Sequence, residues 1–386
     1  MIDTFFVDLH IHIGRDWNGK PVKITGSKSL TLSNILEEAT NRKGLDMVGV
    51  IDAQAPAVQE EMIDLIDRGQ AHELKEGGIR YEDTVLLLGS EIEVYDAACS
   101  GPIHVLCFFP TVNRMRAFTT WLSQKMKNVN LSSQRFYGTA RELQQYVKEH
   151  EGIFIPAHVF TPFKSLYGKG VKETLREVLD PDKIDAVELG LSADTGMADL
   201  IGELEPYTYV TNSDAHSLGK LAREYQQMAL KALNFEELQM ALHNQQGRKV
   251  LTNYGMSPAM GKYHQTVCAK CLSPAKLSAS HCEACGSEKI VKGVKDRVQE
   301  LKSSTQKKER PPYIYQVPLS SLPGVGTRTY EKLMEAFSTE MAVIHEVSRE
   351  ELRAVIPEQV VERIIAMRKG TLTIQAGGGG HYGRIQ

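Results

Sequence analysis

Short apolar segments that read as strands alternate with helical patterns through about residue 250, and this alternation constrains the fold more than any other feature. The strand-like segments are 4–12, 46–52, 84–94, 102–109, 152–157, 184–190 and 207–211, and helical periodicity falls at 32–43, 57–75, 114–127, 139–150 and 220–245. Such alternation predicts an α/β barrel or a layered α/β sheet.

The first of these segments carries a polar pattern that an ordinary buried strand lacks. In the stretch VDLHIH at 7–12, the residues Asp8, His10 and His12 occupy every second position. Residues two apart in a strand point to the same face, so we expect these side chains to converge on one side while the apolar ones pack on the other. Two neighbouring imidazoles at a strand end suggest a metal site.

Most of the later strand-like segments also end in a group that can ligate a metal. These groups are Glu91, Glu93, His104, His158, Glu188, Asp214 and His216. The carboxyl ends of strands meet at one mouth in α/β folds, so a single cleft is expected to collect His10, His12, Glu91, His104, His158, Asp214 and His216. A lone histidine at a strand end is more often a hydrogen-bonded core residue. That interpretation does not explain why histidines and carboxylates occur at several successive strand ends.

The order of these motifs resembles the polymerase-and-histidinol-phosphatase (PHP) family of metal-dependent phosphoesterases. The motifs are DLHIH, GSE, IHVL, PAH and SDAH, within about residues 1–250. The resemblance implies a distorted (β/α)7-type barrel that holds up to three metal ions. One motif departs from the family: where Thr-Asp-His is usual after the second strand, this chain has Ile51, Asp52 and Ala53. One expected ligand is therefore absent, and Asp52 or Asp16, with Asp8, are further candidate ligands.

The ligand types fit the hydrolysis of a phosphodiester. Divalent metal ions generate hydroxide near neutral pH and neutralise charge that develops on the phosphate. Imidazoles with carboxylates suit Zn²⁺, Mn²⁺ or Fe²⁺ better than Mg²⁺, and two or three ions are expected. We assign one position to His10, His12, Glu91 and Asp214, and the others to His104, His158 and His216. We take Glu91 and Asp214 as bridging ligands and Glu91, Asp214 and His216 as the catalytic residues.

Four cysteines after the barrel predict a separate zinc module over residues 256–292. The pairs Cys268, Cys271 and Cys282, Cys285 have the CxxC spacing of a tetrahedral, structural Zn²⁺ site. Two disulfides are the alternative, but the N-terminus lacks the basic start of a secretion signal. The segment 293–312, rich in Lys, Glu, Gln and Ser, is expected to be a linker or helix.

A glycine turn near the C-terminus predicts a helix-hairpin-helix-like DNA-binding domain over 313–370. The motif LPGVG at 322–326 precedes a helical pattern, and the backbone N–H groups of Gly324, Val325 and Gly326 would face a phosphate. A degenerate second copy follows, with Pro-Glu-Gln in place of the glycine turn. An ordinary helical bundle with a glycine loop is the alternative. The glycine-rich tail, 371–386, is expected to be flexible.

The charge distribution also indicates a polyanionic partner. The net charge of −3 combines −9 for residues 1–260 with +6 for residues 261–386. A basic appendage on an acidic body favours DNA as partner, single- or double-stranded, although solvated lysines often give such numbers. No apolar run of about 18 residues occurs. We therefore expect a cytoplasmic, nucleoid-associated protein without membrane contact, with replication or repair proteins as further candidate partners.

The order of barrel, zinc module and hairpins is similar to that of a family of PHP-type DNA repair endonucleases. The resemblance implies hydrolysis on the 5′ side of a deaminated base (uracil, hypoxanthine or xanthine) or of an abasic site, leaving a 3′-hydroxyl and a 5′-phosphate. Two alternatives stay open. One is a small-molecule phosphatase of the histidinol-phosphatase kind, and the other is a non-catalytic DNA damage-binding scaffold, suggested by Ala53.

A base-reading role is expected for Asn212. If 209–216 stays extended, its amide lies on the same face as Asp214 and His216. A fixed amide can make two hydrogen bonds to the carbonyl and N–H edge that uracil and hypoxanthine share. The alternatives are that Asn212 orients a metal ligand or caps a turn, with the base read by the aromatic loop 160–167.

Overall fold

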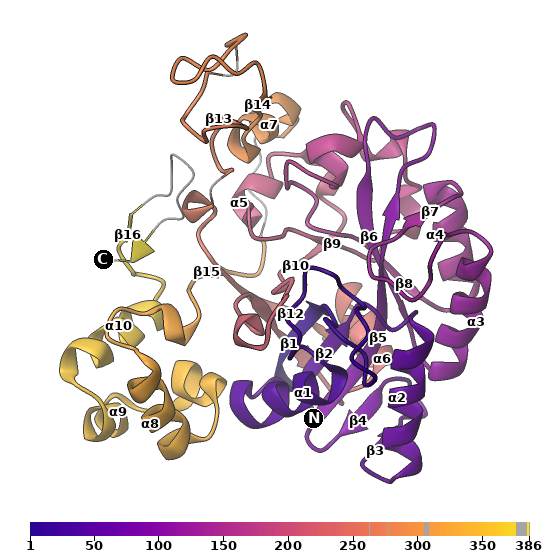
Figure 1. Cartoon of the computed structure of the whole chain (residues 1–386). Coiled ribbons are helices and arrows are strands. Elements are labelled where there is room, and N and C mark those ends of the chain that lie inside the picture. Colours follow the sequence, from indigo (N-terminus) through magenta and orange to yellow (C-terminus); the bar gives the residue numbers. More distant parts are fainter. Residues whose placement is uncertain (262, 277, 305–308, 376–383, 386) are drawn as a thin grey trace.

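A large mixed sheet forms the centre of the computed structural model, which describes residues 1–261, 263–276, 278–304, 309–375 and 384–385. Its strands are β1 (Asp3–Ile11), β2 (Met47–Val50), β3 (Ala71–Glu73), β4 (Ile79–Tyr81), β5 (Thr84–Val94), β6 (Ile103–Phe109), β7 (Arg135–Phe136), β8 (Ile153–Pro156), β11 (Tyr225–Leu230), β12 (Lys249–Gly255) and β15 (Tyr313–Tyr315). The sheet runs β12–β11–β1–β2–β5–β6–β8, and the separate pair β9 (Ala186–Glu188) and β10 (Thr208–Val210) lies between β8 and β12. The result is a distorted barrel (Figure 1).

Helices surround the barrel on its outer face and at one end. They are α1 (Leu32–Glu37), α2 (Pro56–Asp67), α3 (Val112–Ser123), α4 (Ala140–Glu149), α5 (Thr195–Ala198) and α6 (Phe235–Leu242). The expected α/β class is confirmed. None of the helices among the described residues is long and apolar enough to cross a lipid bilayer.

The interior of the barrel shows how an apolar strand delivers a ligand. Along β5, Val85 and Leu87 fill the lumen, and Gly89 leaves room for the ring of Phe108, since a Cβ there would lie 2.5 Å from Phe108 Cε1. Side chains alternate along a strand, so Glu91 emerges on the same face at the carboxyl end. One face of the strand therefore carries core side chains first and a candidate metal ligand at its end.

The predicted elements 220–245 and 57–75 are wrong in part. The first contains β11, which lies antiparallel between β1 and β12, before α6 begins. The second ends as a helix at Asp67 and continues into β3. Both segments hold short apolar runs with spacings that helices and buried strands share, and periodicity alone does not separate them.

The segment after the barrel leaves it and then returns to it. The four-cysteine region contains β13 (Val267–Cys268) and β14 (Ile290–Val291), and α7 (Val294–Leu301) follows. The Arg297 guanidinium fastens α7 to the barrel by donating to the carbonyl oxygens of Tyr167 (2.8 Å) and Val171 (2.9 Å). Strand β15 then pairs in parallel with β12, so residues 313–315, which we expected in the helical domain, belong to the barrel sheet.

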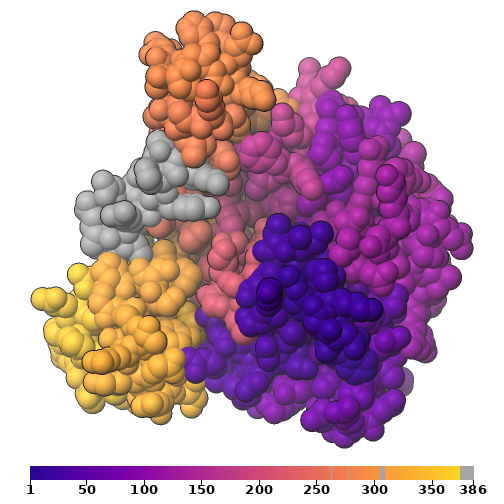
Figure 2. Space-filling view, viewed as in Figure 1, coloured from indigo at the N-terminus to yellow at the C-terminus, as the bar shows by residue number. Residues whose placement is uncertain are grey.

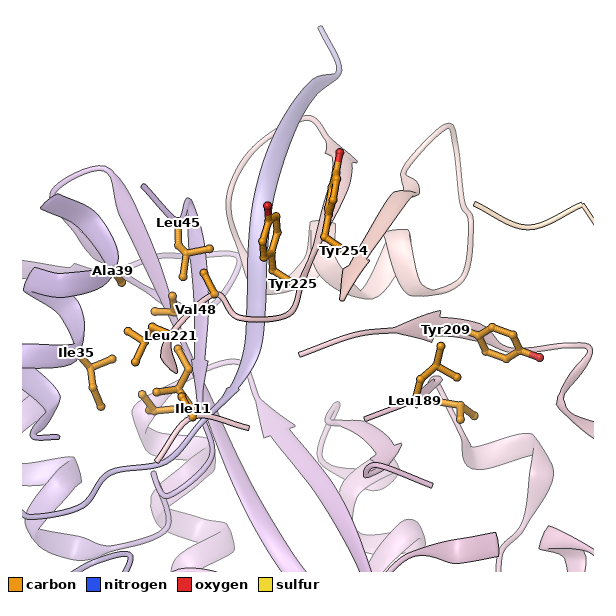
Figure 3. Close-up of a cluster of buried hydrophobic side chains, with 14 of the residues drawn as sticks. Ile11, Ile35, Ala39, Leu45, Val48, Leu189, Tyr209, Leu221, Tyr225 and Tyr254 are labelled. Carbon is orange, nitrogen blue, oxygen red and sulfur yellow. The ribbon is translucent and has the colours of Figure 1, made fainter. Parts of the chain in front are cut away.

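Three helices near the C-terminus pack beside the start of β1. They are α8 (Thr327–Phe337), α9 (Arg349–Val355) and α10 (Glu358–Arg368). The ring of His345 stacks on Phe6 with 4.5 Å between centroids, and its Nε2 forms a 2.6 Å hydrogen bond with the Tyr225 hydroxyl. Tyr225 itself stacks on Tyr254 of the neighbouring strand (Figure 3). Lys43 and Glu340 form a buried ion pair at the same contact.

The C-terminal helices and the cysteine segment form two separate lobes on one side of the barrel (Figure 2). After α10, the described residues contain a short pair of strands, β16 (Ile374–Gln375) and β17 (Arg384–Ile385). The glycine run at 377–380, on which the flexible-tail prediction depends, lies outside the described residues.

A buried carboxyl group next to β11 predicts a measurable pH dependence of stability. Burial raises the pKa of Glu224 to about 8, and its Oε2 has no hydrogen-bond partner among the described residues. The unfolded chain ionises this group near its ordinary pKa, about 4.3. Between that pH and 8, the unfolded state loses a proton that the folded state keeps, so stability falls as pH rises.

Glu224→Gln removes this titration, so its stability relative to the wild type should increase by roughly 4 kcal/mol between pH 4.5 and 8.5. Urea unfolding at several pH values measures the difference. The exposed Glu236→Gln on α6 is the matched control and should show no such trend. If the difference in unfolding free energy between Glu224→Gln and the wild type is the same at pH 4.5 and at pH 8.5, the prediction is contradicted.

Candidate metal centre

Two groups of metal-ligand side chains face each other where the barrel strands end. One consists of His10, His12 and Asp214, and the other of Glu91, His104 and His158, with the ligand atoms of each group within 4.8 Å of one another. The sequence predicted that these six residues meet in one cleft, and the structure brings them together.

Glu91 lies between the two groups. Its carboxylate oxygens are 3.6 Å from both His10 Nε2 and His12 Nε2, and Asp214 Oδ1 is 3.5 Å from the same two nitrogens. Ligands about 2.0–2.2 Å from a common ion at tetrahedral angles lie about 3.4 Å apart. These separations therefore suit one ion between the four side chains, while the other Glu91 contacts reach His104 (2.8 Å) and His158 (3.2 Å).

Three imidazole nitrogens support a metal site independently of the distances. The Nε2 atoms of His10, His12 and His104 are buried and have no hydrogen-bond partner among the described residues. A buried polar atom without a partner is costly, and a divalent cation would satisfy each lone pair. The side chains present therefore fit divalent ions of the kind that imidazole and carboxylate ligands select.

Glu188, at the end of β9, orients His10. Its position at a strand end was visible in the sequence, but no role was expected for it. Its Oε1 accepts hydrogen bonds from His10 Nδ1 (2.9 Å) and from Asn212 Nδ2 (2.8 Å), and its Oε2 accepts from the backbone N–H of His158 (2.8 Å). A carboxylate behind an imidazole fixes its tautomer and leaves Nε2 for the metal. Its strand-end position was the available signal.

Asp52 plays the same part for His12. Its Oδ2 lies 3.1 Å from His12 Nδ1 and accepts a 2.8 Å hydrogen bond from the backbone N–H of Ile13. Asp52 belongs to neither ligand group among the described residues, so the structure places it behind a ligand. Ala53 is fully buried beside it and offers no ligand atom.

Asp8 and Asp16 also lie outside both ligand groups. The pairing of β1 with β2 shifts register between Asp8 and Ile11, and this irregularity separates Asp8 from the two histidines. The Asp8 carboxylate instead accepts from the backbone N–H groups of Ser213 and Ala222. The Asp16 carboxylate accepts two backbone hydrogen bonds within its own turn. The expectation that Asp8, His10 and His12 share one face is therefore corrected for Asp8.

His216 lies beside the first ligand group without joining it. Its ring is 4.6 Å from that of His12, and its Nδ1 is 3.0 Å from the backbone carbonyl of Asp214. Burial and the nearby His12 lower the pKa of His216 to about 4. Asp214 has a φ of 45°; burial opposes its ionisation, but His10 and His12 hold its pKa well below the usual range.

Asn212 is placed behind the ligands, which corrects its expected role in reading a base. The side chain is 1% exposed. Its amide oxygen accepts from the backbone N–H of Leu9 (2.8 Å) and from Gln226 Nε2 (3.2 Å), and its amide nitrogen donates to Glu188. Strand alternation placed Asn212 on the correct face but gave no measure of depth, and burial leaves no accessible edge for a base.

A lysine from the loop after β1 enters the same site. Lys23 Nζ donates to Ser133 Oγ (2.7 Å) and lies 3.4 Å from Glu91 Oε2. The sequence did not single out this lysine, because the loop that carries it has no regular pattern. The structure thus adds a cation next to the carboxylate that both ligand groups share.

The four cysteines also come together. Cys268, Cys271, Cys282 and Cys285 have Sγ atoms within 4.8 Å of one another, and all are free thiols. The Sγ separations of 3.6 Å and 3.5 Å are far longer than a disulfide bond and close to the roughly 3.8 Å spacing around a tetrahedral Zn²⁺. The cluster therefore fits a structural zinc ion.

The predicted phosphate-binding turn lies at the start of α8. Gly324 has a φ of 89° and Gly326 is the N-cap residue. Both glycines are exposed, whereas Val325 is buried. Arg363 of α10 donates a 3.0 Å hydrogen bond to the carbonyl of Pro323, so the turn packs against the second predicted hairpin.

Comparison with known proteins identifies the family. No protein-family model matches the chain. The uncharacterized protein YqxK of Bacillus subtilis is 52% identical over 99% of both chains, and MJ0043 of Methanocaldococcus jannaschii is 39% identical over 58% of this chain and 31% of its own length. The lesion-specific endonuclease PfuEndoQ of Pyrococcus furiosus matches with a TM-score of 0.85 and 31% identity, over 100% of this chain and 95% of that one.

The chain belongs to the endonuclease Q family. A second endonuclease Q structure, a complex with a 27-mer duplex substrate with an abasic lesion at the active site, matches with a TM-score of 0.85 and 32% identity over 100% of this chain and 96% of that one. The expected enzyme class, a hydrolase of the endonuclease type, is confirmed by this membership.

Proposed function

We propose that this endonuclease Q homologue nicks damaged DNA on the 5′ side of a deaminated base (uracil, hypoxanthine or xanthine) or an abasic site, leaving a 3′-hydroxyl and a 5′-phosphate. The whole-chain match to a complex with an abasic duplex carries the proposal. The two ligand groups that share Glu91 supply the chemistry that it requires.

The ligands have distinct roles in this mechanism. His10, His12, Glu91 and Asp214 would hold one divalent ion, and Glu91 with His104 and His158 a second. Bound ions would supply Lewis-acid activation of water and neutralise charge at the scissile phosphate. Glu188 and Asp52 hold the imidazoles of His10 and His12 in the tautomers that expose Nε2.

Two further side chains would act on the substrate directly. The Lys23 ammonium, 3.4 Å from Glu91, is placed to donate to a phosphate oxygen as negative charge builds up there. His216 turns Nδ1 towards the Asp214 carbonyl, so its Nε2 is available for proton exchange at the scissile group. We assign structural support to the zinc module, 256–292, and DNA holding to the helical region after β15, 316–370, through Gly324, Val325 and Gly326.

Single-lesion duplexes test the proposal. Strands labelled at the 5′ end, with uracil, hypoxanthine, xanthine, an abasic site or no lesion, are incubated with the enzyme across Mn²⁺, Zn²⁺ and Mg²⁺ titrations. We expect a metal-dependent nick 5′ to each lesion, and a product that a polymerase extends. Turnover of p-nitrophenyl phosphate with intact DNA would favour a small-molecule phosphatase, and binding without breakage would favour a damage-binding scaffold.

The position of Asn212 predicts that its loss affects all lesions alike. Asn212→Ala removes a hydrogen bond from Glu188 and so loosens His10. Such a change behind a ligand typically lowers metal affinity or activity about 10–100-fold. Cleavage rates at uracil, hypoxanthine and abasic sites should fall by the same factor, with partial recovery at high Mn²⁺. A loss confined to the two bases would restore the base-reading role.

A further inference from the structure

An arginine at the mouth of the barrel contacts two exposed tyrosine rings. Arg135 begins β7 (Figure 1). Its guanidinium carbon is 5.0 Å from the ring centre of Tyr95 and 5.4 Å from that of Tyr137, and it donates a 2.6 Å hydrogen bond to the Tyr95 carbonyl. The rings are 39% and 50% exposed. These two cation–π contacts and the hydrogen bond hold the guanidinium in place.

No acidic side chain among the described residues forms an ion pair with this arginine. Among the residues that the structure describes, Arg135 takes part in no ion pair, whereas ion pairs hold Arg42, Arg68, Arg114, Arg248, Arg297, Arg310, Arg349 and Arg353. Lys127 Nζ, 6.0 Å from the Tyr137 ring, adds positive charge. A fixed guanidinium with free N–H groups matches the geometry of a phosphate.

The register of β7 relates Arg135 to the metal centre. Arg135 pairs with Glu93 of β5, and paired residues of neighbouring strands lie on the same face of a sheet. Glu93 lies two residues beyond Glu91, which is about 7 Å along the strand, and its carboxylate is 3.8 Å from His104 Nε2. Arg135 is therefore on the metal side of the sheet, and buried Phe136 points the other way.

We propose that Arg135, held in place by Tyr95 and Tyr137, binds a backbone phosphate of the cleaved DNA strand one or two nucleotides from the scissile phosphate. This assignment rests on the proposed function. The two exposed rings offer faces on which an adjacent sugar or base packs irrespective of sequence. The site would hold the strand in register over the metals and would not read the lesion.

Removing the charge of Arg135, and separately the charge of single DNA phosphates, tests the contact. Arg135→Met keeps the apolar stem of the side chain and removes its charge, and Arg116→Met, on the exposed face of α3, is the matched control. Binding to an abasic duplex is measured in an Asp214→Asn background, so that the strand stays intact. We expect about 10-fold weaker binding for Arg135→Met and a salt dependence reduced by about one phosphate contact. In the cleaving enzyme KM should rise while kcat is kept.

Duplexes with a single neutral methylphosphonate locate the phosphate. At one position within two nucleotides of the cut, the methylphosphonate should weaken the wild-type interaction but not weaken Arg135→Met further. Additive losses at every such position, or wild-type affinity of Arg135→Met, would overturn the assignment. A wild-type enzyme that leaves lesion duplexes intact would contradict the proposed function itself, whereas nicking together with these binding results would contradict only the role of Arg135.

Discussion

Asp214→Asn should reduce cleavage of lesion DNA by roughly three orders of magnitude while leaving DNA affinity nearly unchanged. The Asp214 carboxylate is 3.5 Å from both His10 Nε2 and His12 Nε2, and an amide in its place removes the negative charge that would hold the ion between them. The DNA-holding surface that we propose lies largely on other elements. Single-turnover cleavage of an abasic duplex, with metal content measured by mass spectrometry, separates the two effects.

Asp16→Asn is the matched control for this variant. Asp16 lies on the loop after β1, and its carboxylate accepts hydrogen bonds only from its own turn among the described residues. It should keep both its metal ions and its activity. Full activity of Asp214→Asn, or equal losses in the two variants, would refute the ligand assignment.

Cys268→Ser should release the structural zinc ion and unfold the segment around it. Free energies of structural zinc binding in small modules are about 10–16 kcal/mol, more than a segment with one short strand pair, β13 and β14, can replace. DNA affinity should also fall. Because α7 connects this segment to the barrel surface, unfolding the segment would disturb the surface on which we expect DNA to lie. Zinc content, limited proteolysis and duplex binding measure the three consequences.

Cys99→Ser serves as the control, since Cys99 is a buried thiol of the barrel outside the cysteine cluster. It should keep its zinc and its protease resistance. A Cys268→Ser variant with a full zinc content would show that the four thiols do not form the site.

Strand ends were predictable from the sequence because hydrophobic periodicity and ligand chemistry point to the same places. Glu91 of β5 and His158 after β8 reach the predicted cleft, since each follows an apolar run. His104 reaches it from the start of β6, because that strand runs antiparallel to β5. Asp8 does not, because the register shift in β1 comes from pairing with β2, and local sequence does not encode such a shift. The sequence also gave no information on how deeply a side chain is buried. Asn212 and Glu188 share a face with the ligands but lie beneath them.

The boundaries between the parts of the chain depend on distant contacts. Nothing in residues 313–315 distinguishes an edge strand of the barrel from the start of a helical region, and only the pairing with β12 decides it. The antiparallel place of β11 between β1 and β12 likewise follows from long-range pairing. Periodicity reports the environment of a segment but not the identity of its neighbour.

The parallel pairing of β12 with β15 makes the cysteine segment the crossover connection between two adjacent strands. Parallel neighbours always require a long connection, and in most α/β folds a helix supplies it. Here residues 256–312 take that place, and both anchor points lie in the sheet. The sequence and structure of a crossover connection can vary without disturbing the sheet, as long as the two strands that it joins keep their positions. Exchanging this segment between homologues should therefore yield chimaeras that keep an intact metal centre while their contacts with DNA outside it vary.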